Sequence, residues 1–161
     1  SVARGYAAAE HIAIRGGSNG GLLTSGALVQ YPECFGAAVI QVPLTDMLRY
    51  HTLSAGASWM AEYGDPDNPE ERAAIETWSP LHNVRPRDEV AYPPALVTTS
   101  TRDDRVHPGH ARKFAARLGD MGYDHLYYED TAGGHSNDAD PVANARRWAR
   151  HYVYLAQQLM D

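Results

Sequence analysis

The distribution of apolar and polar positions along the 161 residues predicts an alternation of strands and helices. Short apolar runs predict four strands, at residues 11–15, 37–42, 94–101 and 124–130. Longer segments with a helical period predict three helices, at residues 20–31, 108–122 and 140–159. Strands that alternate with helices, without a hairpin signal between them, indicate a parallel α/β sheet.

The helix predicted over residues 20–31 places four apolar side chains on one face: Leu22, Leu23, Ala27 and Leu28. The segment from residue 43 to residue 94 is less regular. Within it, Asn68 is a suitable helix cap and Pro69 a suitable first helical residue. We therefore expect a further short helix to begin there.

Composition and charge are those of a soluble globular domain, with 43% hydrophobic and 21% charged residues. A net charge of −6 with a single lysine gives no reason to expect nucleic acid or an anionic membrane as partner. No apolar run approaches the roughly 20 residues that a membrane span needs. The single cysteine, Cys34, excludes an internal disulfide. We expect it to be a half-buried structural thiol, and we expect a cytoplasmic location.

Unusual polar loops follow three of the predicted strands. GGSNGG follows the first strand, TRDDRVHPGH the third and TAGGHSND the fourth. Loops at the carboxyl ends of parallel strands gather at one edge of the sheet, so a serine, an aspartate and a histidine are expected to meet there. Serine, then aspartate, then histidine is the chain order of the α/β-hydrolase triad, and residues 16–20 fit its G-x-S-x-G turn.

The glycines around Ser18 have a physical explanation in such a turn. A serine between a strand and a helix has a strained backbone and an exposed hydroxyl, and Cβ atoms at the flanking positions would collide with neighbouring backbone. The helix that follows directs free N–H groups at an oxyanion formed beside the serine. A purely structural glycine turn is the alternative. A phosphate-binding loop is not supported, because no lysine follows the glycines and G-x-G-x-x-G is absent.

Asp103 and His135 complete the candidate set. Asp103 follows the end of its strand most directly, so we predict that it orients the histidine, whereas Asp104 is better placed to bond local backbone or Arg105. Among the eight histidines, His135 follows two glycines in the loop after the last strand, where the base of a triad has to reach the serine.

Together, GGSNGG, DDRV and the late GGH resemble the prolyl oligopeptidase family of serine peptidases. The segment GASWMAEYGDPDNPEERAAIETWSPLHNV is similar to the same family's region between the second and third strands of this stretch. The resemblance extends over nearly the whole chain. It implies a catalytic set of nucleophile, orienting acid, general base and oxyanion donor: Ser18, Asp103, His135 and the backbone N–H of Asn19.

The same resemblance implies a substrate pocket. Trp59 would stack on a substrate proline ring, with Tyr63 and Val106 as neighbours in the pocket. Arg105 would bind a carbonyl group of the substrate backbone. Without the resemblance, a tryptophan between two alanine-rich segments is more simply explained as a core side chain.

No metal and no cofactor are expected. Residues 65–76 have a superficial likeness to a calcium loop, but Pro69 occupies a ligand position and Glu70 occupies the position that needs glycine.

The domain organisation is expected to be partial, because an α/β-hydrolase sheet normally has several strands before the nucleophile strand. We expect residues 1–161 to form the C-terminal half of the hydrolase domain, with about four parallel strands flanked by helices. The N-terminal half, the family's β-propeller and an upstream tyrosine that supplies a second oxyanion donor would lie outside this chain. The first strand would then have an unpaired edge, so we expect a homo-oligomer or association with the missing N-terminal part.

Three functions remain open at this point. The first is a serine peptidase that hydrolyses short peptides, with cleavage after proline, through an acyl-enzyme intermediate; the chain by itself would be weakly active or inactive. The second is an α/β-hydrolase esterase, which proline peptides and aryl esters would distinguish from a peptidase. The third is a non-catalytic hydrolase-like binding module, against which the intact set of Ser18, Asp103 and His135 counts.

Overall fold

The computed structural model describes residues 4–135 and 140–160, and it has the predicted parallel α/β architecture. Its strands are β1 (Ala13–Gly17), β2 (Ala37–Gln41), β3 (Ala95–Ser100) and β4 (His125–Asp130). Neighbouring strands are parallel and follow the order β1-β2-β3-β4, which leaves β1 at one edge of the sheet. The predicted fold class is confirmed.

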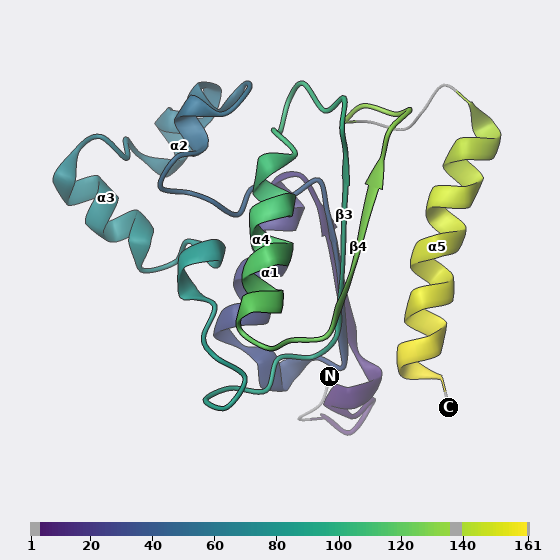
Figure 1. Ribbon diagram of the computed structural model, residues 1–161. Helices are drawn as coiled ribbons and strands as arrows, with labels where there is room; N and C mark the ends of the chain where they lie inside the picture. Colours follow the sequence, from purple (N-terminus) through teal and green to yellow (C-terminus); the bar gives the residue numbers. More distant parts are fainter. Residues whose placement is uncertain (1–3, 136–139, 161) are drawn as a thin grey trace.

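The α-helices are α1 (Asn19–Gln30), α2 (Met60–Tyr63), α3 (Pro69–Glu76), α4 (Gly109–Asp120) and α5 (Pro141–Leu159). Figure 1 shows α1 and α4 on one face of the sheet and α5 on the opposite face, with α2 and α3 farther out on the side of α1. Within the described residues, no helix combines the length and the apolar character that crossing a bilayer requires.

The core forms on both faces of the two central strands. Every residue of β3 is buried, because helices cover the sheet from both sides. Alternating side chains divide between two clusters. Ile40 and Val97 pack with Phe114 of α4, whereas Val39 and Leu96 pack with Tyr154 of α5. Burial on both faces explains why these strands are continuous apolar runs in the sequence.

The segment between β2 and β3 is a series of short helices, as its irregular pattern indicated. Its 3-10 helices are Tyr50–Thr52, Gly56–Trp59 and Pro80–Asn83. The predicted helix start is confirmed, since the Asn68 side chain accepts a hydrogen bond from the backbone N–H of Glu70 at 3.0 Å and Pro69 is the first residue of α3.

Two predictions about individual side chains are wrong. Leu23 is 74% exposed, because at about 100° per residue it lies more than a third of a turn from the centre of the face on which Leu22, Leu28 and Val29 are buried. Cys34 is exposed rather than half-buried, because it belongs to a 3-10 helix, Pro32–Cys34, which ends before the chain enters the sheet.

Gly21 and Gly26 lie in the same helix, and an added methyl group should have opposite effects at the two positions. A Cβ at Gly21 would lie 2.7 Å from the carbonyl oxygen of Gln41 and 2.8 Å from the Cα of Pro43, whereas a Cβ at Gly26 meets nothing within 4 Å. We expect Gly21→Ala to lower the free energy of unfolding by about 1–3 kcal/mol. Gly26→Ala should raise it by about 0.5–1 kcal/mol. Urea unfolding measures both changes, and equal effects would contradict this difference in packing.

Candidate active site

Ser18 lies between β1 and α1 in a backbone conformation that few residues other than glycine adopt. Its φ is 58° and its ψ is −119°, a geometry that costs on the order of 1–3 kcal/mol. Its N–H donates to the carbonyl of Gln41 at 3.0 Å, and its own carbonyl accepts from the N–H groups of Gly21 and Leu22. Hydrogen bonds on both sides therefore hold this turn in its strained form.

Two of the four glycines around Ser18 are required by close packing. A Cβ at Gly16 would lie 2.1 Å from the carbonyl oxygen of Gly20, and Gly21 packs against the chain that leaves β2. A Cβ at Gly17 would make an ordinary contact of 3.5 Å, and one at Gly20 would meet nothing within 4 Å. The predicted collision is confirmed at Gly16 and Gly21 and is wrong at Gly17 and Gly20.

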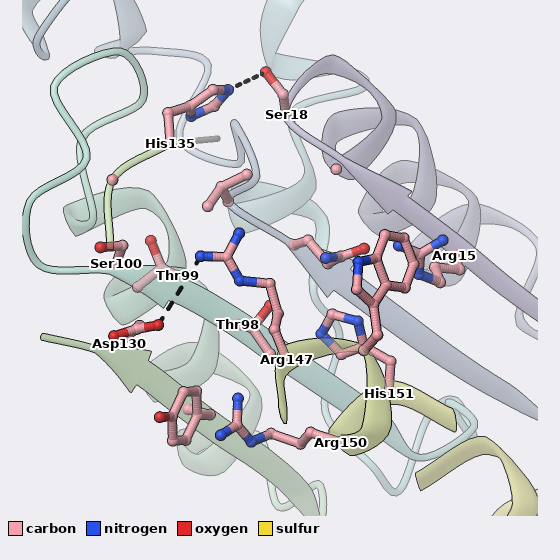
Figure 2. A pocket seen from close by; sticks show the side chains of 16 residues that line it. Arg15, Ser18, Thr98, Thr99, Ser100, Asp130, His135, Arg147, Arg150 and His151 are labelled. Atoms are coloured by element: carbon pink, nitrogen blue, oxygen red, sulfur yellow. Dashed lines mark hydrogen bonds and ion pairs between the residues drawn. The ribbon is translucent and has the colours of Figure 1, made fainter. Parts of the chain in front are cut away.

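The side chains of Ser18, His135 and Asp103 form one series of hydrogen bonds. His135 Nε2 lies 3.0 Å from Ser18 Oγ, and His135 Nδ1 lies 2.8 Å from Asp103 Oδ2. Figure 2 draws the first of these contacts as a dashed line. Because an ionised carboxylate only accepts hydrogen bonds, Nδ1 carries the proton and Nε2 accepts from the serine hydroxyl. The three residues meet where the sequence places them, at the carboxyl ends of β1, β3 and β4.

Asp103 is the aspartate in this series, and Asp104 is not. The Asp103 side chain is fully buried. Its Oδ1 accepts from the backbone N–H groups of Arg105 at 3.0 Å and Val106 at 2.8 Å, so both carboxylate oxygens have partners. Asp104 is exposed to solvent. Three hydrogen bonds thus fix the buried carboxylate and aim Oδ2 at His135.

The loop that carries His135 is held by the ends of β3 and β4. Asp130 Oδ1 accepts from the N–H groups of Ala132 at 2.9 Å and Gly133 at 3.4 Å. The bond from Ala132 is the main cause that lowers the pKa of the Asp130 carboxyl, and burial opposes it. The hydroxyl of Ser100 donates to the carbonyl of Gly133. These contacts fix the backbone two residues before His135.

Three of the residues expected to bind substrate belong to one apolar cluster, which also includes Leu22 of α1. Trp59 and Tyr63 are partly buried against an apolar cluster: Leu22, Leu44, Met47, Leu48, Tyr50, Ile75 and Val106. Trp59, Tyr63 and Val106 therefore share one cluster, while the Arg105 side chain is exposed nearby in sequence. Asn19 is the first residue of α1, so its backbone N–H has no partner within the helix.

The sequence matches the prolyl oligopeptidase family over residues 1–161. The chain belongs to this family. A relative, uncharacterized peptidase y4nA of Sinorhizobium fredii, is 50% identical over 160 residues, which are 99% of this chain and 22% of the relative. The prolyl endopeptidase of Dictyostelium discoideum is 40% identical over 117 residues, 73% of this chain and 15% of that protein.

A solved structure, that of a post-proline cleaving enzyme from Rickettsia typhi, has the same arrangement of elements. Its TM-score is 0.93 at 38% identity, with 98% of this chain and 23% of that chain covered. The α/β fold of this protein is therefore that of the hydrolase domain of the prolyl oligopeptidase family. The chain spans about a fifth of the length of these relatives.

A cavity of about 400 Å³ opens between the sheet and α5, next to Ser18 and His135. Sequence reasoning missed its lining, which includes three arginines and a buried histidine: Arg15, Arg147, Arg150 and His151. The guanidinium groups of Arg15 and Arg150 lie over the rings of Trp148 (4.1 Å) and Tyr128 (3.3 Å). Arg147 and His151 are four residues apart on one helix face, a spacing that could have indicated a shared site.

One group of side chains has the composition of a metal site. Ligand atoms of His51, Asp65 and Asp67 lie within 4.8 Å of one another. His51 Nε2 lies 3.2 Å from Asp67 Oδ2, and the N–H of Asp67 donates to Asp65 Oδ1 at 2.9 Å. These contacts describe a side-chain hydrogen bond and a local turn before α3, and we assign no metal to them.

Two buried histidines differ from the one beside Ser18. His110 Nδ1 accepts from the N–H groups of Thr45 at 3.2 Å and Asp46 at 3.1 Å, and burial lowers the pKa of His110 to about 4. His151 is 1% exposed, and neither of its ring nitrogens has a hydrogen-bond partner among the described residues. Burial, with a smaller effect from Arg15, lowers the pKa of His151 to about 4. Both imidazoles are therefore uncharged in the folded protein at neutral pH.

These two histidines should make the fold sensitive to acid. The unfolded chain takes up a proton at each from about pH 6.5 downward, whereas the folded chain does so only near pH 4. Because the unfolded state binds more protons in this window, the free energy of unfolding should fall as pH falls from 6.5 to 4. His151→Phe removes one group without breaking a described hydrogen bond, so it should reduce this slope. Urea unfolding at several pH values measures it, and an unchanged slope would contradict the assignment.

Proposed function

We propose that Ser18, Asp103 and His135 are the catalytic triad of a serine peptidase that hydrolyses short peptides through an acyl-enzyme intermediate. The observation that carries this proposal is the hydrogen-bonded series from Asp103 through His135 to the serine on its strained turn. Membership of the prolyl oligopeptidase family supports the reaction class. The similarity to a post-proline cleaving enzyme supports cleavage after proline.

The first half of the reaction forms the acyl-enzyme. Ser18 Oγ attacks the carbonyl carbon of the scissile bond while its proton passes to His135 Nε2. Asp103 Oδ2, already bonded to Nδ1, stabilises the imidazolium that results. The carbonyl oxygen becomes an oxyanion, to which the backbone N–H of Asn19 donates. His135 then gives the proton to the leaving amine, and the carbon–nitrogen bond breaks.

The second half of the reaction releases the acid product. Water attacks the ester carbonyl on Ser18 while His135 Nε2 takes its proton. The same histidine returns that proton to Ser18 Oγ as the ester bond breaks, which restores the starting state. Asp103 keeps the imidazole in one orientation throughout, because its second oxygen is tied to the backbone of the following turn.

Trp59 and Tyr63 would select the substrate. A proline ring packed on Trp59 would contact the apolar cluster that also contains Val106, and Arg105 would donate to a carbonyl of the substrate backbone. A cytoplasmic location belongs to the same proposal, since the single cysteine forms no internal disulfide.

The edge of the sheet at β1 offers a surface for association. In the described part of the chain, β1 pairs with β2 alone, so the backbone groups on its outer side face away from the sheet. Such edges recruit further strands. The exposed side chains of Tyr152 and Val153 on α5 add apolar surface on the same molecule. We infer that this edge pairs with another strand, and that a second copy fills it when no other polypeptide does.

Chemical labelling tests the triad. A fluorophosphonate should modify Ser18 and no other serine, and Ser18→Ala should abolish the modification. Asp103→Asn should slow it by about 10³–10⁴-fold, because the imidazole loses its correct tautomer. The matched control is Asp104→Asn, which removes the neighbouring exposed carboxylate and should leave the labelling rate unchanged. Equal loss in the two variants, or modification elsewhere, would refute the assignment.

Hydrolysis assays separate the peptidase from an esterase. A short peptide with proline before the scissile bond should be cleaved, and it should be cleaved faster than the same peptide with alanine in that position. Turnover should be low, because Asn19 is the one oxyanion donor assigned among the described residues, and a site with one donor fewer typically reacts about 10²–10³-fold more slowly. Hydrolysis of an aryl ester without any peptide cleavage would favour the esterase.

Light scattering tests the association. At micromolar concentration the chain should have a mass above the 17.7 kDa of a monomer. A monomer with a cooperative melting transition would show that the free edge of β1 is tolerated, and the inferred pairing would be wrong.

A further inference from the structure

The side chain of Asn19 is held from both ends by α2. Its Oδ1 accepts from the hydroxyl of Tyr63 at 2.5 Å, and its Nδ2 donates to Glu62 Oε1 at 3.5 Å. An ionised carboxylate has no proton to donate, so the amide nitrogen has to face Glu62 and the amide oxygen has to face Tyr63. Two consecutive residues, more than forty positions away in the sequence, thus fix the orientation of one amide.

Tyr63 is itself held in place. Its ring meets the ring of Tyr50 edge-on, at 5.8 Å between centroids and 85° between planes, and it lies 6.1 Å from the ring of Trp78. Tyr50 is fully buried, and its hydroxyl donates to the carbonyl of Gly64, the residue after Tyr63. Burial, with a smaller effect from Glu62, raises the pKa of Tyr63 to about 12. The phenol is therefore protonated at neutral pH and acts as the donor.

The anchored side chain belongs to the residue whose backbone N–H is the proposed oxyanion donor. That N–H belongs to the peptide unit between Ser18 and Asn19, whose rotation is set by the strained ψ of Ser18, −119°, and by the φ of Asn19. A side chain fixed at its far end restricts rotation of the backbone that carries it. An oxyanion donor has to point at the place where charge develops, so a small rotation reduces its effect.

We propose that Tyr63 is a positioning residue, whose hydroxyl, through the side chain of Asn19, fixes the backbone N–H of Asn19 for the developing oxyanion. This proposal rests on the proposed function of Ser18. It also links recognition to rate, because α2 follows directly after Trp59. A substrate ring packed on Trp59 and Tyr63 immobilises α2 and with it the oxyanion donor. A substrate with a small side chain at that position loses rate in addition to binding.

Tyr63→Phe tests the proposal, since it removes the hydroxyl and keeps the ring. The limiting rate of fluorophosphonate labelling at Ser18 should fall about tenfold, the value of one hydrogen bond of roughly 1.4 kcal/mol. The probe concentration for half-maximal rate should stay the same. A tyrosine that served only as a wall of the substrate pocket would instead change that concentration and leave the limiting rate unaltered.

A double-mutant cycle and a control isolate the contact. Asn19→Ala keeps the backbone N–H and removes the side-chain amide, so it should slow labelling as Tyr63→Phe does. The two changes together should cost no more than either alone, because they break the same contact. Tyr123→Phe is the control, since the hydroxyl of Tyr123 donates to the carbonyl of Val90, outside the site. Additive losses, or an equal loss in the control, would overturn the proposal.

A second measurement does not depend on catalysis. In ¹⁵N relaxation experiments the order parameter of the Asn19 amide should be lower in Tyr63→Phe than in the unaltered chain, and unchanged in Tyr123→Phe. An unchanged order parameter in Tyr63→Phe would overturn the proposal. If the unaltered chain fails to label at Ser18 while this order parameter still falls, the proposed function fails and the positioning contact stands.

Discussion

The positive φ of Ser18 is the constraint on which the rest of the site depends. This backbone geometry turns the chain sharply out of β1, so the hydroxyl points toward His135 while α1 begins at the next residue. The backbone strain at Ser18 is maintained by the close packing around it, which leaves no room for a Cβ at Gly16 or Gly21. Val42, just after β2, also has a positive φ of 36°, and its N–H donates to the carbonyl of Thr98. At the carboxyl ends of both β1 and β2, a residue with positive φ is therefore held by a backbone hydrogen bond to the neighbouring strand.

Three other parts of the fold hold the groups that surround this turn, namely Asp103, His135 and Asn19. β3 and the loop after it deliver a fully buried carboxylate whose charge is held by two backbone N–H groups. Asp130, the last residue of β4, accepts a hydrogen bond from the N–H of Ala132 and so holds the loop that carries His135. The irregular segment after β2 reaches across to α1 and ties down Asn19. Because each group is fixed by contacts other than those within the series, the hydrogen bonds among Ser18, His135 and Asp103 need little rearrangement to form.

Sequence reasoning recovered the parts of this arrangement that follow from chain order. The four strands and their helices are marked by apolar runs, and parallel pairing then brings the loops of Ser18, Asp103 and His135 to one edge. The choice of Asp103 over Asp104 followed from its place at the strand end. The bond between Tyr63 and Asn19 could not be predicted, since it depends on how an irregular segment crosses α1. The cavity beside α5 depends on the distance between a helix and a sheet, which no local pattern encodes.

The tautomer of His135 tests the central claim most directly. If the three residues act as one series, Asp103 holds the proton on Nδ1 and Ser18 donates to a bare Nε2. In a protein with ¹⁵N-labelled histidine, at a pH where the ring is neutral, His135 should show a protonated Nδ1 and an unprotonated Nε2, and Asp103→Asn should alter this pattern. A neutral His135 with its proton on Nε2, unaffected by Asp103→Asn, would contradict the assignment of Ser18, Asp103 and His135 to one catalytic series.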